Sequence, residues 1–152
     1  MSVLRPSHEH SFMQVAEVLA QRSTCARRKV GAVLVNDYHH IIGTGYNGVA
    51  RGMDHCHYNY CGGQHYPSGQ GLEACLAIHA EQNALMQCHN VMEISAIYVT
   101  TSPCMHCLKM LLNTGCKMIY YKTLYDDKSL DLWTSFRGKH AHRVDYDLDP
   151  QV

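Results

Sequence analysis

Short, β-branched apolar runs alternate with segments of helical spacing along most of this 152-residue chain. Five strands are predicted from these runs, at residues 30–35, 40–46, 94–101, 117–121 and 142–146. The first two should form a hairpin, because only a short turn around Asn36 and Asp37 separates them. The last should be a short edge strand.

Apolar residues at helical spacing fill the intervals between these runs. They predict helices at about residues 7–21, 72–90, 103–112 and 130–136. Pro103 suits the first turn of the third helix, and Gly115 is expected to end it in the left-handed conformation. A strand pair followed by strand–helix alternation predicts a mixed sheet covered by helices on both faces, a three-layer α/β/α architecture. At this length we expect residues 1–152 to form one domain.

The charge of the chain is balanced, with 13 basic and 13 acidic residues and a formal net charge of +0. A protein that follows nucleic-acid backbones usually carries a strong positive field, and the only tight basic run here is Arg27, Arg28 and Lys29. We therefore expect a small-molecule substrate and no nucleic-acid partner. With no 18-residue apolar run and no apolar signal segment in the first residues, we also expect no membrane association and a cytoplasmic location.

Eight cysteines and twelve histidines are the unusual part of the composition. The cytosol keeps thiols reduced, so a disulfide framework is disfavoured. Metal ligation is the alternative, although most of the histidines are expected to be ordinary surface residues.

Two short motifs carry the candidate chemistry. His79-Ala80-Glu81 precedes one predicted strand, and Pro103-Cys104-Met105-His106-Cys107 follows it. One imidazole and two thiolates, from His79, Cys104 and Cys107, fill three corners of a zinc tetrahedron and leave the fourth for water. Glu81 is then the general acid–base: zinc lowers the pKa of bound water to about 7, and the carboxylate moves protons to N3 of a cytosine ring and to the departing amine.

Each motif alone is weak evidence, but in this order and context they resemble the established H-x-E…P-C-x-x-C signature of zinc-dependent deaminases. From about residue 12 to residue 146 the chain resembles the cytidine deaminase superfamily and, within it, the deoxycytidylate (dCMP) deaminases. The segments that carry this likeness are Arg22-Ser23-Thr24-Cys25, Val30-Gly31-Ala32-Val33, Gly45-Tyr46-Asn47-Gly48, His55-Cys56, His79 to Ala84, Thr101 to Cys104, Tyr120-Tyr121 and Tyr125-Asp126.

The resemblance implies a central five-stranded mixed sheet and hydrolysis of dCMP to dUMP, which supplies dUMP for thymidylate synthesis. It also implies that Asn47 contacts the sugar, that the backbone of Ala80 and Ser102 reads the pyrimidine edge, and that Tyr125 forms a wall of the nucleotide pocket. Two alternatives stay open: Asn47 as an ordinary turn residue, and Tyr125 as a half-buried surface aromatic.

A second, structural zinc is implied by the same resemblance. Its ligands would be Cys25, Cys56, Cys61 and Cys75, with His57 or His65 as substitutes for one of them. The alternative is that these four cysteines are small buried hydrophobes. Cys88 and Cys116 are expected to be core thiols.

Regulation is implied by resemblance alone: a homohexamer activated by dCTP and inhibited by dTTP, with Mg²⁺ accompanying the triphosphate. Arg27, Arg28 and Lys29 are the candidate effector contacts, against the alternative of a solvated basic turn.

Three other functions remain to be weighed. They are a polynucleotide deaminase that flips a base into the pocket, a non-catalytic zinc module, and a deaminase of free cytidine or of a pterin- or guanine-type base.

Overall fold

The computed structural model describes residues 5–25, 27–55, 67, 70 and 75–145. Five strands form one sheet: β1 (Gly31–Val35), β2 (Ile41–Tyr46), β3 (Ala96–Thr101), β4 (Met118–Thr123) and β5 (His140–Arg143). Their order is β2-β1-β3-β4-β5. The β1–β2 and β1–β3 pairs are antiparallel, whereas β3–β4 and β4–β5 are parallel. The predicted hairpin and mixed five-stranded sheet are confirmed.

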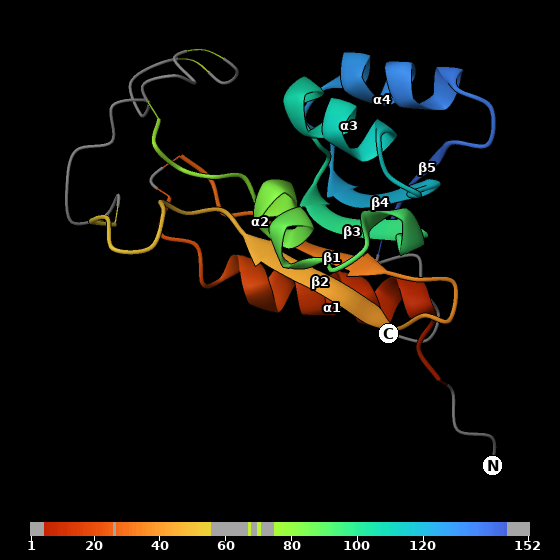
Figure 1. Ribbon diagram of the computed structural model, residues 1–152, viewed down its shortest axis with the longest axis horizontal. Helices are drawn as coiled ribbons and strands as arrows, with labels where there is room; N and C mark the ends of the chain where they lie inside the picture. Colours follow the sequence, from red (N-terminus) through yellow and green to blue (C-terminus); the bar gives the residue numbers. More distant parts are fainter. Residues whose placement is uncertain (1–4, 26, 56–66, 68–69, 71–74, 146–152) are drawn as a thin grey trace.

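Helices cover both faces of the sheet, as Figure 1 shows. The helices are α1 (His8–Ala20), α2 (Ala80–Gln87), α3 (Met105–Leu112) and α4 (Asp127–Ser135), with a short 3₁₀ turn, η2 (Val91–Glu93). Met13 and Ala16 of α1 pack against Val33, Val35 and Tyr98 on one face. Helices α2, α3 and α4 share a larger cluster with alternate residues of the same strands on the other face. The three-layer α/β/α prediction is confirmed.

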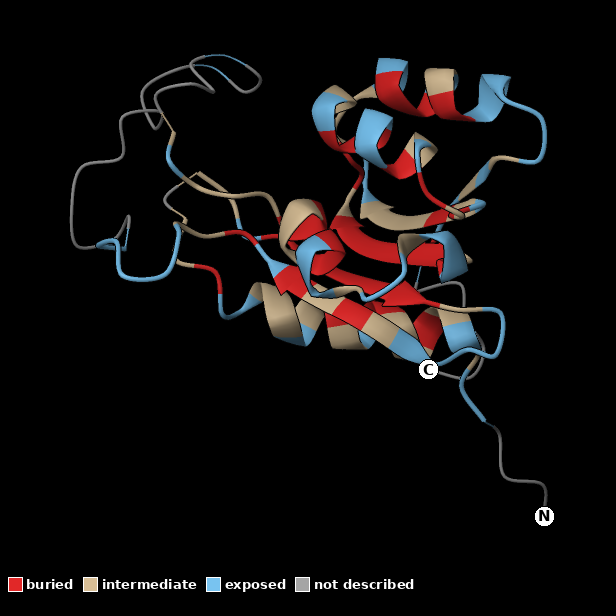
Figure 2. Cartoon of the chain, in the orientation of Figure 1, coloured by how far each residue is buried: buried red, intermediate tan, exposed pale blue. Residues whose placement is uncertain are grey.

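Period-two alternation in the central strands explains these two cores. Leu34 and Ile97 face α2, α3 and α4, while their neighbours Val33 and Tyr98 face α1. Strand β1 is buried along its whole length and β3 along nearly all of it, as Figure 2 shows.

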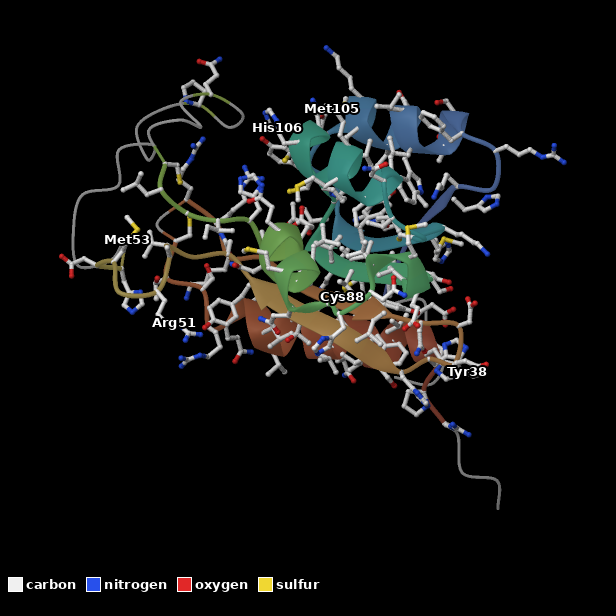
Figure 3. The ribbon with its side chains drawn as sticks, viewed as in Figure 1. Tyr38, Arg51, Met53, Cys88, Met105 and His106 are labelled. Atoms are coloured by element: carbon white, nitrogen blue, oxygen red, sulfur yellow. The ribbon has the colours of Figure 1, made fainter. Side chains whose placement is uncertain are left out.

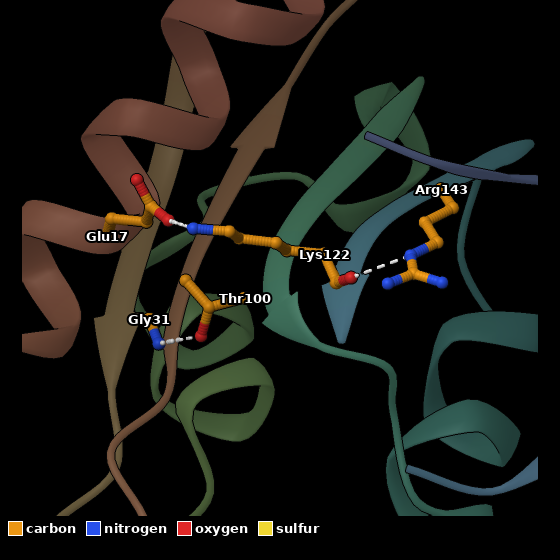
Figure 4. A network of polar contacts seen from close by, with 5 residues as sticks. All are labelled: Glu17, Gly31, Thr100, Lys122 and Arg143. Carbon is orange, nitrogen blue, oxygen red and sulfur yellow. Dashed lines mark hydrogen bonds and ion pairs between the residues drawn. The ribbon is translucent and has the colours of Figure 1, made fainter. Parts of the chain in front are cut away.

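Polar contacts near the strand ends join neighbouring strands of the sheet and link β4 to α1 (Figure 4). The Gly31 N–H donates to Thr100 Oγ1 at 3.1 Å, so a side chain continues the β1–β3 ladder. Lys122 of β4 forms an ion pair with Glu17 of α1, and Arg143 Nε donates to the Lys122 carbonyl at 3.2 Å.

Helix α2 begins at Ala80, so the prediction of a helix from residue 72 is wrong for residues 75–79, while residues 71–74 lie outside the described residues. Ile78 instead forms a β-bridge with Gly48, with N–H···O distances of 2.8 and 3.1 Å. Gln82 Oε1 accepts from the His79 N–H at 2.9 Å, and this capping contact fixes the start of the helix at His79, a candidate metal ligand. Leu76, whose spacing favoured a longer helix, is 62% exposed.

Two other local predictions need correction. Strand β5 spans His140–Arg143 instead of 142–146, because its pairing starts at Met118↔His140 and Trp133 Nε1 donates to the His140 carbonyl. Gly115 is not in the left-handed conformation. Glycine is needed there because the backbone at Met92 passes close by, and a Cβ on Gly115 would lie 2.1 Å from the Met92 carbonyl oxygen.

Two cysteines outside the candidate metal ligands, Cys116 and Cys88, contact the larger core. Cys116 is fully buried, as predicted, whereas Cys88 at the end of α2 is half-buried against the larger core. Figure 3 labels Cys88 and also Tyr38, which is 79% exposed in the β1–β2 turn.

Among the residues that the structure describes, no helix has the length and apolarity to cross a membrane.

Candidate metal centre and active site

Three potential metal ligands meet where α2 and α3 begin. His79 is the N-cap of α2, Cys104 is the N-cap of α3, and Cys107 lies in the first turn of α3. His79 Nδ1 is 3.5 Å from Cys104 Sγ and 3.3 Å from Cys107 Sγ. Tetrahedral zinc, with Zn–S of about 2.3 Å and Zn–N of about 2.0–2.1 Å, requires N···S separations of about 3.6 Å. The three residues therefore fit a single zinc ion, and Figure 3 marks Met105 and His106 between the two cysteines.

The two cysteines are inequivalent thiols. The pKa of Cys104 is lowered, chiefly because the Cys107 thiol hydrogen-bonds to the Cys104 thiolate and also because His79 lies beside it. The pKa of Cys107 is raised by that same hydrogen bond and by burial. The hydrogen bond to Cys104 also raises the pKa of His79. The pair already favours one thiolate, the anionic form in which cysteine binds metals.

Glu81 lies in the first turn of α2, two residues after His79, and is only 4% exposed. Burial raises the pKa of its carboxyl group, because a carboxylate is poorly solvated there. Glu81 lines the same pocket as His79 and Cys104. A buried carboxyl group beside an open metal position is the arrangement that a general acid–base requires.

Asn47, Ala80, Ser102 and Tyr125, which the resemblance names as substrate contacts, all line this pocket. The structure brings these four residues together, and their contact with a substrate stays a prediction.

Two of these residues also build the pocket wall. Asn47 Nδ2 donates to the Arg28 carbonyl and Asn47 Oδ1 accepts from the Val30 N–H, both at 2.8 Å. Ser102 Oγ accepts from the Tyr125 N–H at 2.7 Å. Asn47 is therefore more than an ordinary turn residue, because its side chain holds the segment that leads into β1.

The sequence of this site matches a known family model, described as the cytidine and deoxycytidylate deaminase zinc-binding region, over residues 6–123. The chain is a member of this family. The match spans α1 to β4 and includes all three ligands and Glu81.

Other family members are similar over most of the chain. A deoxycytidylate deaminase of Schizosaccharomyces pombe is 38% identical over 126 residues, which are 80% of this chain and 39% of that protein. A deoxycytidylate deaminase of Mycobacterium phage D29 is 39% identical over 127 residues, which are 77% of this chain and 95% of that protein. The chain thus spans well under half of the yeast relative and nearly all of the phage relative.

A solved structure shares the fold. The crystal structure of dCMP deaminase from the cyanophage S-TIM5, in complex with dCMP and dUMP, aligns with a TM-score of 0.72 at 29% identity. The alignment covers 93% of this chain and 99% of the cyanophage chain. The cytidine deaminase-like fold is confirmed.

Within this family member, the four cysteines of the expected second zinc are only partly described. Cys25 and Cys75 are half-buried and both line the catalytic pocket. Cys56 and Cys61, like His57 and His65, lie outside the described residues. Across the described ranges, His79, Cys104 and Cys107 are the one group of three ligands close enough to share an ion. The second zinc site stays a prediction.

The basic run Arg27, Arg28 and Lys29 divides in the structure. Arg27 and Arg28 line the catalytic pocket, whereas Lys29 is outside its wall. Arg27 donates to the carbonyls of Pro67 and Gln70, at 3.0 and 3.2 Å. The Arg28 guanidinium carbon lies 4.4 Å from the centroid of the Tyr125 ring. Their position just before β1 predicts these residues near Asn47, beside the catalytic pocket, but as contacts for an effector; Arg27 and Arg28 instead line the pocket itself.

Proposed function

We propose that this chain catalyses the zinc-dependent hydrolytic deamination of dCMP to dUMP. The observation that carries the proposal is the buried Glu81 carboxyl group beside the His79, Cys104 and Cys107 triad, in a pocket that also contains Arg28. Two findings support this choice of substrate. The relatives are deoxycytidylate deaminases, and the similar cyanophage enzyme was solved with dCMP and dUMP bound.

The residues divide the chemistry between them. Zinc bound by the triad supplies a Lewis acid that lowers the pKa of bound water to about 7. Glu81 would take one proton from the attacking water and pass it to N3 of the cytosine ring, and would then move the remaining proton of the new C4 hydroxyl group to the departing amine. A C4–O bond forms and the C4–N bond breaks, so ammonia leaves and the uracil product remains.

Incubating the zinc-loaded protein with dCMP, CMP, dCTP, deoxycytidine and guanine, and following ammonia release, tests this proposal. We expect dCMP to be the best substrate. No ammonia from any cytosine nucleotide, at full zinc content, would instead support the non-catalytic zinc module. A salt-dependent affinity for RNA would favour the polynucleotide deaminase, which the balanced charge of the chain disfavours.

Arg28 explains how the pocket would distinguish a nucleotide from a nucleoside. Its guanidinium stacks on Tyr125 at the pocket wall, and a guanidinium is well matched to a phosphate. Losing a hydrogen bond to a charged group costs about 1.5–3 kcal/mol. Arg28→Gln should therefore lower kcat/KM for dCMP by roughly 10–150-fold and leave the smaller kcat/KM for deoxycytidine unchanged.

Lys29→Gln is the matched control, since Lys29 is adjacent in sequence but outside the pocket wall. It should alter neither substrate's kcat/KM. Equal losses for dCMP and deoxycytidine in Arg28→Gln would contradict a phosphate contact and indicate general damage to the pocket.

The second zinc, with Cys25, Cys56, Cys61 and Cys75 as ligands, belongs to the same proposal. The half-buried thiols of Cys25 and Cys75, which line the same pocket, support it. Metal analysis should find about two zinc ions per chain, and Cys56→Ser should lose one of them because a structural site needs four ligands. Cys88→Ser is the control. Unchanged metal content and unchanged Tm in Cys56→Ser would show that the four are ordinary thiols.

We also propose that the protein acts in the cytoplasm, where reducing conditions keep the ligand thiols available. Family resemblance further supports a homohexamer that dCTP, with Mg²⁺, activates and dTTP inhibits. Because Arg27 and Arg28 line the catalytic pocket, an effector would need a separate site. A second hollow, between the loop 48–55 and α2, includes Arg22 and Arg51 and offers such a place.

A further inference from the structure

The segment that joins β3 to α3, residues 102–104, is fastened to the segment that joins β4 to α4. The Ser102 N–H donates to the Thr123 carbonyl at 2.8 Å, and Ser102 Oγ accepts from the Tyr125 N–H at 2.7 Å. Strands β3 and β4 are parallel, so their carboxyl ends lie side by side and the two connections run next to each other. Helices α3 and α4, which follow them, pack together above the sheet (Figure 1).

Ser129, in the first turn of α4, makes the third contact between these segments. Its hydroxyl donates to the Pro103 carbonyl at 2.7 Å, and the Asp126 carbonyl lies 3.0 Å away. Ser129 has 0% exposure, so bulk water does not compete with its hydroxyl for the Pro103 carbonyl. A hydroxyl carries one hydrogen, and the shorter distance indicates that Pro103 receives most of it.

The Pro103 carbonyl belongs to the peptide group immediately before Cys104. An N-cap residue usually anchors the start of its helix with its own side chain. Cys104 makes no such hydrogen bond, and its sulfur lies 3.5 Å from His79 Nδ1. A hydroxyl of the neighbouring helix α4 thus helps to fix the peptide group at the start of α3.

We infer that Ser129 is a positioning residue for the metal centre. By fixing the Pro103–Cys104 peptide, it sets the direction in which the Cys104 thiolate points toward His79 and Cys107. The inference rests on the zinc site of the proposed function, but it concerns metal binding and does not depend on the substrate. Groups that orient metal ligands typically change metal affinity by about 10–100-fold when removed.

The test is the zinc affinity of Ser129→Ala, measured by competition with a chromophoric chelator. We expect it to fall by about 10–100-fold relative to the unmodified chain. The visible absorption of the Co²⁺-substituted protein should also change, because those bands report the geometry of the thiolates around the ion. Thr134→Ala is the matched control: Thr134 is exposed on the same helix, and its hydroxyl donates within α4, with the Leu130 carbonyl at 3.0 Å.

A Ser129→Ala protein with zinc affinity within about twofold of the unmodified chain and an unchanged Co²⁺ spectrum would overturn the inference, whatever its Tm, because a merely structural hydroxyl would affect only stability. If the alanine variant does not fold, Ser129→Cys, whose thiol is somewhat larger and a weaker donor than the hydroxyl, is judged by the same thresholds. Failure of the unmodified chain to bind zinc would instead contradict the proposed function.

Discussion

Glu81→Gln should lower turnover of dCMP by about 10²–10⁴-fold, the range that one general acid–base group contributes, while the zinc content stays the same. The amide has nearly the size of the carboxyl group and sits two residues from His79 without contributing a ligand. It cannot carry a proton between water, N3 and the departing amine. Steady-state ammonia release and metal analysis on the same preparation measure the two quantities.

Glu93→Gln is the control for this substitution. Glu93 is exposed on η2 and lies away from the pocket wall, so its amide should leave turnover unchanged. Because burial raises the pKa of Glu81, the folded protein disfavours the carboxylate, and the neutral amide should not lower the Tm of the metal-free protein. A Glu81→Gln enzyme that keeps more than about a tenth of the original turnover would refute the proton-shuttle role.

The sheet could be predicted because the signal for it is local. The run 30–35 is apolar at every position but glycine, and such a continuous apolar run is typical of a strand that is buried on both faces. The position of α3 follows nearly as well, because a proline marks the approach to a helix; Pro103 lies just before the N-cap Cys104 and not in the first turn as predicted, and the helix starts at Met105.

The start of α2 depends on contacts that sequence spacing does not reveal. Leu72 and Leu76 continue the helical period, yet residues 75–79 are not helical, and Ile78 pairs with Gly48 some thirty positions earlier. The same limit applies within the site. Arg28 contacts Tyr125 and Ser129 contacts Pro103, and both partners are distant in sequence. Nothing in the neighbourhood of Ser129 distinguishes it from any serine in the first turn of a helix.

Gly31→Ala should be among the most destabilising single-methyl additions in this chain. A Cβ at Gly31 would lie 1.9 Å from the carbonyl oxygen of Ala16 and 2.7 Å from the Ala20 nitrogen, both in the backbone of α1. Strand β1 pairs with β2 on one side and β3 on the other, so it cannot move aside without breaking a ladder. Overpacking of this kind typically costs 1–3 kcal/mol, and we expect about 3 kcal/mol because both clashing groups are backbone.

For a chain of this size that cost corresponds to a Tm lower by about 6–12 °C in thermal unfolding at saturating zinc. Gly48→Ala is the matched control, because nothing lies within 4 Å of its added Cβ and its φ is not in the left-handed region. Its stability should stay within about 0.5 kcal/mol of the original. Equal Tm values for the two variants would mean that α1 can withdraw from β1 at little cost. In that case the close contact between Gly31 and Ala16 would not be a requirement of the fold.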